Sequence, residues 1–189
     1  RFPRTPEEMT ALRARGVLAA KDLCAFIDAS PTPFHAVSEV VRRLGAAGFT
    51  EVSEREVFRF SPGEKRYVVR GGSTIIAFVI GAESPADAGF RVIGAHTDSP
   101  NLRVKPSSDA SKHGYRQVGV EVYGGALYST WMDRDLSIAG RVLVRRGDAI
   151  EARVVDLAKT VCRVPNIAIH LNRGVNNDGL VLNAQKHLV

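Results

Sequence analysis

The sequence predicts an α/β fold in which helices lead into a mostly hydrophobic sheet and a β-rich module follows. Three changes of pattern support this prediction. Apolar residues recur at helical spacing up to Leu44, β-branched residues gather in short runs beyond Phe49, and polar, turn-rich sequence begins after Pro100. We therefore expect one domain over residues 1–100 and a second, β-rich domain over residues 101–189.

The first helices are separated by two prolines. Residues 7–15 are charged and helix-prone, and residues 18–29 carry apolar side chains in a helical setting. Pro31 and Pro33 then forbid a continuous helix. Thr32 is suited to cap a second helix, because its hydroxyl can accept a bond from the first turn and Pro33 fits the first helical position.

A β-hairpin is expected next. Residues 66–70 and 73–80 are rich in valine, isoleucine and phenylalanine, and they flank Gly71 and Gly72. Two glycines between β-rich runs are typical of a tight turn whose backbone adopts positive φ angles. A loop over residues 81–89 should then lead into the next strand.

The stretch that carries the most chemistry begins at residue 90. Residues 90–95 form a short apolar run that predicts a buried strand, and its C-terminal end delivers His96 and Asp98. Ligands of α/β sheets bind at the carboxyl ends of strands, and imidazole is a common zinc ligand. Asp98 is placed to orient the His96 ring or an attacking water. Read alone, the same pattern also fits two solvated residues that cap a turn.

The second half of the chain is expected to consist mainly of short strands. Residues 101–115 are polar and turn-rich, and residues 172–188 have the character of a loop. Between them, glycine, asparagine and aspartate separate runs with strand-like composition. The predicted strands cover residues 117–123, 140–145, 150–156 and 167–171.

Two further groups in this half admit two interpretations each. Asp133 and Asp135 flank Arg134. The two carboxylates around the arginine could hold a metal or form a structural ion-pair network, and their spacing favours a loop held by its own charges. His170 ends an apolar run, where a histidine is either a hydrogen-bonded sheet residue or a ligand.

Charge and hydropathy argue against two classes of partner. The formal net charge is +6, but the basic residues are scattered among acidic and apolar ones and form no arginine-rich block. We therefore expect a solvated surface and no nucleic-acid partner. No apolar run approaches the length that spans a membrane, so we expect no membrane association.

The cysteines indicate a cellular location, and the absence of two motifs argues against two classes of enzyme. Cys24 and Cys162 lie far apart, lack metal-ligand spacing and sit among apolar neighbours, which predicts buried reduced thiols and a cytoplasmic location. The sequence contains no G-x-S-x-G nucleophile elbow and no G-x-x-x-x-G-K-[ST] phosphate loop. Serine hydrolases and nucleotide hydrolases are therefore poorly supported.

Taken together, six segments in chain order resemble the aspartyl aminopeptidase family of zinc metallopeptidases, from about Ala19 to the last residue. The segments that carry the resemblance are residues 30–37, 77–81, 94–100, 123–125, 131–136 and 168–171. The resemblance implies part of an α/β/α peptidase domain with a two-metal zinc site, followed by a β-rich inserted dimerisation domain. It further implies a homo-oligomer whose dimers assemble into dodecamers and a peptide substrate that loses its N-terminal, often acidic, residue.

Residue by residue, the resemblance assigns three side chains to the site. His96 matches the family's first zinc ligand, and Asp98 matches the aspartate that supports it, which makes Asp98 the candidate catalytic residue. His170 matches a histidine that serves either as a metal ligand or as a substrate contact across the dimer interface. The segment around Arg134 matches the inserted domain and not the metal carboxylates.

The chain has about half the length usual in the family. The resemblance implies that the family's bridging aspartate, its adjacent glutamates (one the general base), a further aspartate and the last histidine ligand lie beyond residue 189. A catalytic zinc needs three protein ligands and a water. We therefore expect a metal-dependent aminopeptidase, present here as a fragment that lacks most ligands and is inactive alone. The alternative is a truncated chain that acts only in folding or oligomer assembly.

Overall fold

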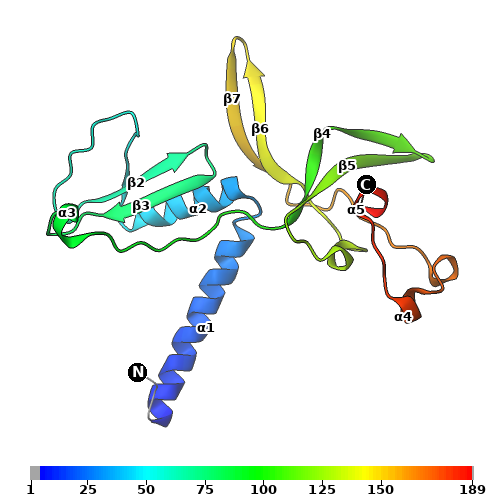
Figure 1. Cartoon of the computed structure of the whole chain (residues 1–189), viewed down its shortest axis with the longest axis horizontal. Coiled ribbons are helices and arrows are strands. Elements are labelled where there is room, and N and C mark those ends of the chain that lie inside the picture. The colour runs from blue at the N-terminus through cyan, green and yellow to red at the C-terminus, as the bar shows by residue number, and fades with distance from the viewer. Residues whose placement is uncertain (1–4, 189) are drawn as a thin grey trace. The chain divides into compact units, whose positions relative to one another are not determined.

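The computed structural model describes residues 5–188, which form helices and short strands, a mixture that agrees with the predicted class (Figure 1). Contacts divide the chain into two compact units. The first comprises the residues up to Asp98 together with Gly140–Val155, and the second comprises Ser99–Ala139 together with the residues from Asp156 onward. These units are groups of contacts, and the division into domains at residue 100 stays a prediction.

The first helix, α1 (Pro6–Asp28), joins both helix-prone stretches of the sequence into 23 residues. Thr5 and Glu8 form a capping box in which each side chain accepts a bond of 3.2 Å from the other residue's backbone N–H. No side chain of α1 is buried among the described residues, so local signals and not burial define this helix.

The second helix, α2 (Pro33–Ala46), begins where the prolines predict. Thr32 is its N-cap, and its hydroxyl accepts a bond of 3.5 Å from the backbone N–H of His35. The same hydroxyl lies 2.7 Å from His35 Nδ1. Two bonds to one histidine fix the chain at this helix start, which confirms the predicted cap.

A cluster of ion pairs lies on the surface of α2. Glu39 is 2.7 Å from the guanidinium groups of both Arg42 and Arg43, and Arg43 also reaches Asp22 of α1 at 2.8 Å. Hydrogen bonds from Arg42 and then Arg43 lower the pKa of Glu39 to about 2. Arg43 therefore links α2 to α1 through Asp22, while Glu39 stays ionised well below the ordinary range of a glutamate.

The sheet of the first unit has the order β1-β2-β3, with β1 (Thr50–Glu51) parallel to β2 (Lys65–Arg70) and β3 (Thr74–Val79) antiparallel to β2. The predicted hairpin is confirmed. Gly71 and Gly72 form its turn with φ angles of +59° and +73°. Residues with a Cβ are strained at these positive φ angles, which explains why both positions of the turn are glycine.

The core of the first unit is small. Ala36 and Val37 of α2 and Tyr67 and Val68 of β2 are its buried apolar residues among those described. Val37 is 2% exposed. Helix and sheet are therefore held together by one layer of apolar side chains.

The predicted buried strand at residues 90–95 is wrong. After the short helix α3 (Pro85–Ala88) the chain runs without strand pairing, and Phe90, Val92 and Ile93 are 81%, 82% and 99% exposed. A strand needs a neighbour to pair its backbone N–H and C=O groups. None of the strands in residues 5–188 pairs with this run, so an apolar sequence with strand-like composition stays unpaired.

A second hairpin belongs to the first unit although it lies far along the sequence. It consists of β6 (Ala139–Arg146) and β7 (Ala149–Asp156), which form a two-stranded sheet. Gly147 lies in the turn with φ +59°. The strands predicted at residues 140–145 and 150–156 are confirmed.

The second unit contains a longer hairpin, β4 (Asn101–Lys112) paired antiparallel with β5 (Tyr115–Tyr123). The predicted strand at residues 117–123 is confirmed, but the predicted loop before it is wrong. The register shifts between Val104 and Asp109, so a bulge absorbs the polar, proline-containing middle of β4. Pairing with β5 thus overrides the turn-rich composition.

The rest of the second unit has little regular structure. Two isolated bridges join residues 132 and 136 to residues 164 and 162. The predicted strand at residues 167–171 is wrong, because this stretch forms a 3-10 turn and pairs with no strand among the described residues. The short helical elements are η1 (Tyr128–Trp131), η2 (Ile169–Leu171), α4 (Val175–Asp178) and α5 (Ala184–His187).

Both cysteines are free. Cys24 is exposed on α1, so the prediction of a buried thiol is wrong there, whereas Cys162 is half-buried. Burial raises the pKa of the Cys162 thiol, whose Sγ lies 3.8 Å from the backbone oxygen of Leu136. Across residues 5–188, no helix combines the length and the apolar character needed to cross a membrane.

Candidate functional site

The structure brings His96 and Asp98 together. His96 Nδ1 lies 2.6 Å from the backbone oxygen of Asp98 and 3.4 Å from its carboxylate Oδ1. The His96 side chain is 81% exposed and that of Asp98 is 42% exposed. The predicted contact between the two residues therefore exists, but the main-chain carbonyl makes the shorter interaction.

This contact determines which ring nitrogen is open to a ligand. A carbonyl oxygen only accepts hydrogen bonds. The proton of the neutral His96 ring therefore sits on Nδ1, which donates a hydrogen bond to the backbone oxygen of Asp98. In the neutral imidazole the lone pair then belongs to Nε2, which faces away from the bond. Metal-binding histidines typically have their second nitrogen held by a carbonyl or carboxylate in this way. The arrangement is thus suited to a metal ligand.

Thr97 ties this segment to the sheet. Its hydroxyl donates a bond of 2.8 Å to the backbone oxygen of Ser73, directly after the glycine turn of the β2–β3 hairpin. Sequence reasoning singled out the histidine and aspartate but not the threonine between them. The signal available was a hydroxyl placed between two candidate site residues, which by itself does not indicate its partner.

His170 lies in the second unit. It is the middle residue of η2 and is exposed, and the predicted sheet position for it is wrong for the same reason as the strand around it. His170 belongs to the second unit and His96 to the first. The role of His170 as ligand or substrate contact stays a prediction.

The aspartates around Arg134 have structural partners. Asp133 Oδ1 accepts a bond of 3.0 Å from the backbone N–H of Asn166, and Asp135 forms an ion pair with Arg163. The hydrogen bond that Arg163 donates to the Asp135 carboxylate raises the pKa of Arg163. Both carboxylates therefore fasten one loop to the next, which supports the ion-pair interpretation, with Arg163 as the partner of Asp135.

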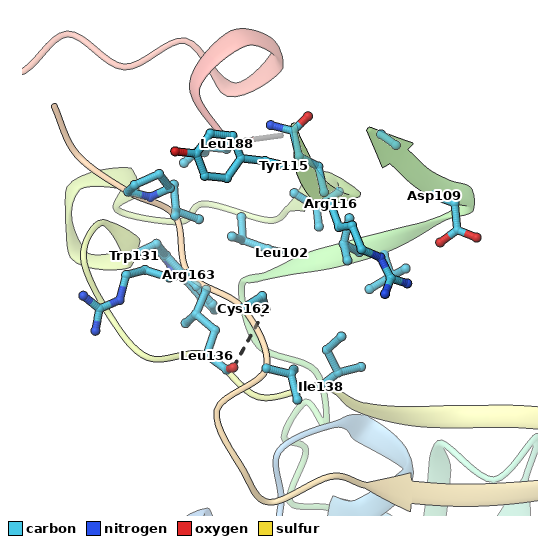
Figure 2. Close-up of a pocket in the computed structure, with 18 of the residues that line it drawn as sticks. Leu102, Asp109, Tyr115, Arg116, Trp131, Leu136, Ile138, Cys162, Arg163 and Leu188 are labelled. Carbon is cyan, nitrogen blue, oxygen red and sulfur yellow. Dashed lines mark hydrogen bonds between the residues drawn. The ribbon is translucent and has the colours of Figure 1, made fainter. Parts of the chain in front are cut away.

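A cavity of about 1080 Å³ lies in the second unit beside the β4–β5 hairpin (Figure 2). Its wall combines apolar side chains such as Leu102 and Trp131 with the charged Arg116. Leu188, 1% exposed, also lines it. His170 is not among its lining residues, so the cavity is separate from the candidate site residue of this unit.

A complete metal site is not formed within residues 5–188. No three histidine, cysteine, aspartate or glutamate side chains of this part of the chain converge in a group able to hold a metal ion. His96 with its Asp98 contact fits one ligand position.

Comparison with known proteins gives this geometry a context. A family model described as aminopeptidase I zinc metalloprotease (M18) matches residues 26–189. A probable M18 family aminopeptidase 2 of Pseudomonas paraeruginosa is 51% identical over 166 residues, which cover 88% of this chain and 38% of the relative. A probable aspartyl aminopeptidase of Ricinus communis is 45% identical over 181 residues, covering 94% of this chain and 37% of the relative.

Solved structures give the same result. The chain superimposes on a chain of the Ape4 and Nbr1 complex with a TM-score of 0.84 and 42% identity, over 89% of this chain and 32% of that one. For the mApe1 dodecamer of S. cerevisiae the TM-score is 0.72 at 34% identity, over 80% and 36% of the two chains. The chain thus spans well under half the length of the relatives it matches and corresponds to their N-terminal part. It belongs to the M18 family of aminopeptidases, the aminopeptidase I zinc metalloproteases.

Proposed function

We propose that this chain is the N-terminal part of a metal-dependent aminopeptidase, a hydrolase that releases N-terminal residues from peptides. The observation that carries the proposal is the contact from His96 Nδ1 to Asp98, which leaves Nε2 open as a ligand in a chain of the M18 family. The relative named as an aspartyl aminopeptidase supports a preference for acidic N-terminal residues.

Zinc fits the donor chemistry at His96. A neutral imidazole with its second nitrogen held by a carbonyl is a typical zinc ligand. His96 would hold one ion of a zinc pair, and such a pair would supply the chemistry of a bound water with a lowered pKa and of a polarised scissile carbonyl. Because no group of three potential ligands is found within residues 5–188, most of the ligands and the general base are proposed to come from the part of the protein beyond this chain.

Each residue of this chain has a separate task in the proposal. His96 holds a metal through Nε2, and Asp98 fixes the tautomer and angle of the ring, with its carboxylate as a second acceptor. His170 contributes either a further ligand or a contact to the substrate from a neighbouring subunit. A test of His170 follows from this difference, since a ligand affects metal content and a substrate contact affects KM.

Assembly and location complete the proposal. The match to a chain of a dodecamer supports a homo-oligomer, and we propose dimers, joined through the β-rich part, as its building block. A cytoplasmic location is supported by the free cysteines, since reduced thiols are usual there. Neither a nucleic acid nor a membrane is part of the proposed function.

The decisive experiment is His96→Ala in the full-length protein. We expect zinc content to fall and turnover of an N-terminal aspartyl peptide to drop by about 100-fold or more, as loss of a direct ligand exceeds the 10- to 100-fold effect of second-shell changes. His113→Asn is the matched control, because His113 is exposed in the β4–β5 turn with φ +53°, which asparagine tolerates. Unchanged zinc content and turnover in His96→Ala would refute the proposal.

The second candidate function is a non-catalytic role in folding or assembly for a chain of this length. The observation that favours it is the absence of a group of three potential ligands within residues 5–188. Purified as 189 residues, the chain should bind little zinc and show little aminopeptidase activity. Robust turnover of this polypeptide would contradict both this candidate and the proposed source of the missing ligands.

A further inference from the structure

The turn of the β2–β3 hairpin binds two segments that are distant in sequence. Thr97 Oγ1 donates to the backbone oxygen of Ser73 at 2.8 Å, across 24 positions. Arg141 Nη1 donates to the backbone oxygen of Gly71 at 2.7 Å, across 70 positions. The segment that carries His96 and the strand β6 are thus attached to two carbonyl groups of one turn, those of residues 73 and 71.

The glycines make these carbonyl groups available. Gly71 and Gly72 both have positive φ angles, and Ser73 N–H closes the turn by a bond of 3.2 Å to the backbone oxygen of Arg70. The β2–β3 register pairs Arg70 with Thr74, so Gly71 and Ser73 lie outside the ladder. Their carbonyl oxygens can therefore accept bonds from side chains.

Arg141 is itself held in place. Its guanidinium carbon lies 4.3 Å from the centre of the Phe34 ring, a cation–π contact at the start of α2. Phe34 Cδ1 also approaches the turn, since a Cβ added at Gly72 would lie 3.7 Å from it. The planar guanidinium thus stacks on an aromatic ring while it donates to the turn, a combination that lysine does not reproduce.

Thr97 is the link between this braced turn and the histidine. Residues 90–98 take part in none of the strand pairings of residues 5–188, so their placement depends on side-chain contacts more than that of a paired strand would. Thr97 is half-buried and adjacent to His96, whose ring is fixed from the other side by Asp98. A shift of the Thr97 backbone would move the His96 Cα and with it Nε2.

We propose that Thr97 is a positioning residue for His96, and that the Gly71–Ser73 turn, braced by Arg141, is its support. This inference rests on the proposed function, in which His96 is a metal ligand. A positioning role of Thr97 and a purely structural role of Thr97 predict different measurements. A positioning residue changes metal affinity and turnover while the unfolding midpoint stays nearly constant, whereas a structural residue changes the midpoint first.

The test compares Thr97→Val with Thr97→Ser in the full-length protein. Valine keeps the shape of threonine but lacks the hydroxyl, and serine keeps the hydroxyl but lacks the methyl group. We expect Thr97→Val to weaken zinc binding by about 10- to 100-fold, the range for residues that orient a ligand. Thr97→Ser should bind zinc within about threefold of wild type, well below that range.

Three measurements separate the explanations. Zinc affinity is measured by competition with a fluorescent chelator, the visible spectrum of the cobalt-loaded protein reports ligand geometry, and thermal unfolding of the metal-free protein reports stability. Weakened binding and an altered spectrum in Thr97→Val, both restored in Thr97→Ser, support the inference. Wild-type zinc affinity in Thr97→Val, or equal losses in both variants, would overturn it.

Arg141→Gln provides an independent route should Thr97→Val fail to unfold cooperatively. It removes the cation above the Phe34 ring but leaves Thr97 and His96 intact, so a loss of zinc affinity between about threefold and about tenfold is expected at a nearly unchanged midpoint. Unchanged affinity in Arg141→Gln would then overturn the inference. If His96→Ala loses zinc but Thr97→Val does not, the positioning role alone fails; if His96→Ala keeps zinc, both proposals fail.

Discussion

Replacing Gly72 by alanine tests whether the turn that supports Thr97 depends on backbone conformation. Gly72 has φ +73°, where an L-residue with a Cβ costs about 1–2 kcal/mol. The new methyl group would lie 3.7 Å from Phe34 Cδ1 and 3.9 Å from Arg141 Nη1, which are ordinary contact distances. No steric clash adds to the cost, and the stiffer unfolded chain offsets about 0.4–1 kcal/mol of it. We expect a net destabilisation of about 1 kcal/mol.

Gly45→Ala is the matched control. Gly45 lies within α2, and a Cβ added there meets nothing within 4 Å. The chemical change and its effect on the unfolded chain are the same, but alanine is about 0.5–1 kcal/mol better than glycine in a helix. The two variants should therefore differ by about 1.5–2 kcal/mol.

Thermal unfolding followed by far-UV circular dichroism measures this difference. At about 2–4 °C per kcal/mol for chains of 150–250 residues, the two midpoints should lie about 3–8 °C apart, with Gly72→Ala the lower. A Gly72→Ala variant as stable as wild type would show that the positive φ angle is not required. A destabilised Gly45→Ala variant would show that the helix propensity argument fails here.

The remaining predictions concern two titrating groups. The pKa of Glu39 is about 2, below its ordinary value of 4.5, so its ionised form stabilises the fold above about pH 4.5, and this contribution is lost as the pH falls toward 2. Glu39→Gln should therefore lower the unfolding midpoint at pH 6, with a difference from wild type that shrinks through this window; a constant difference would contradict the ion-pair cause. Burial raises the pKa of Cys162, whereas Cys24 is exposed. N-ethylmaleimide at pH 7 should alkylate Cys24 first, as peptide mass spectrometry will show, and faster modification of Cys162 would be inconsistent with its burial.

Sequence patterns predicted the elements whose causes are local. The Thr32 cap and the glycine pair at residues 71–72 act within a few residues, and the helix start and hairpin turn occur where they indicate. The apolar run at residues 90–95 has equally strong strand composition but depends on a neighbouring strand, and the polar start of β4 depends on pairing with β5. Composition does not reveal whether a partner is present, which is why these two predictions are wrong.

In the candidate site too, the sequence predicted the local contact but not the contacts that depend on distant residues. The spacing of His96 and Asp98 predicted their contact, because residues two apart are close in any extended segment. The spacing did not reveal that the carbonyl, rather than the carboxylate, makes the shorter bond, nor that Thr97 reaches Ser73. These depend on backbone angles and on a turn 24 positions away, which a sequence pattern does not encode.

The bond between Gly71 and Arg141 has a consequence for synthesis of the chain on the ribosome. Its partners are 70 positions apart, so the hairpin turn emerges well before the arginine that braces it. At translation rates of about 5–20 residues per second, this interval lasts about 4–14 s. During that time the segment with Phe90, Val92 and Ile93 is synthesised while the turn still lacks its brace. The Arg141 brace therefore forms only after the hairpin that it supports has been synthesised.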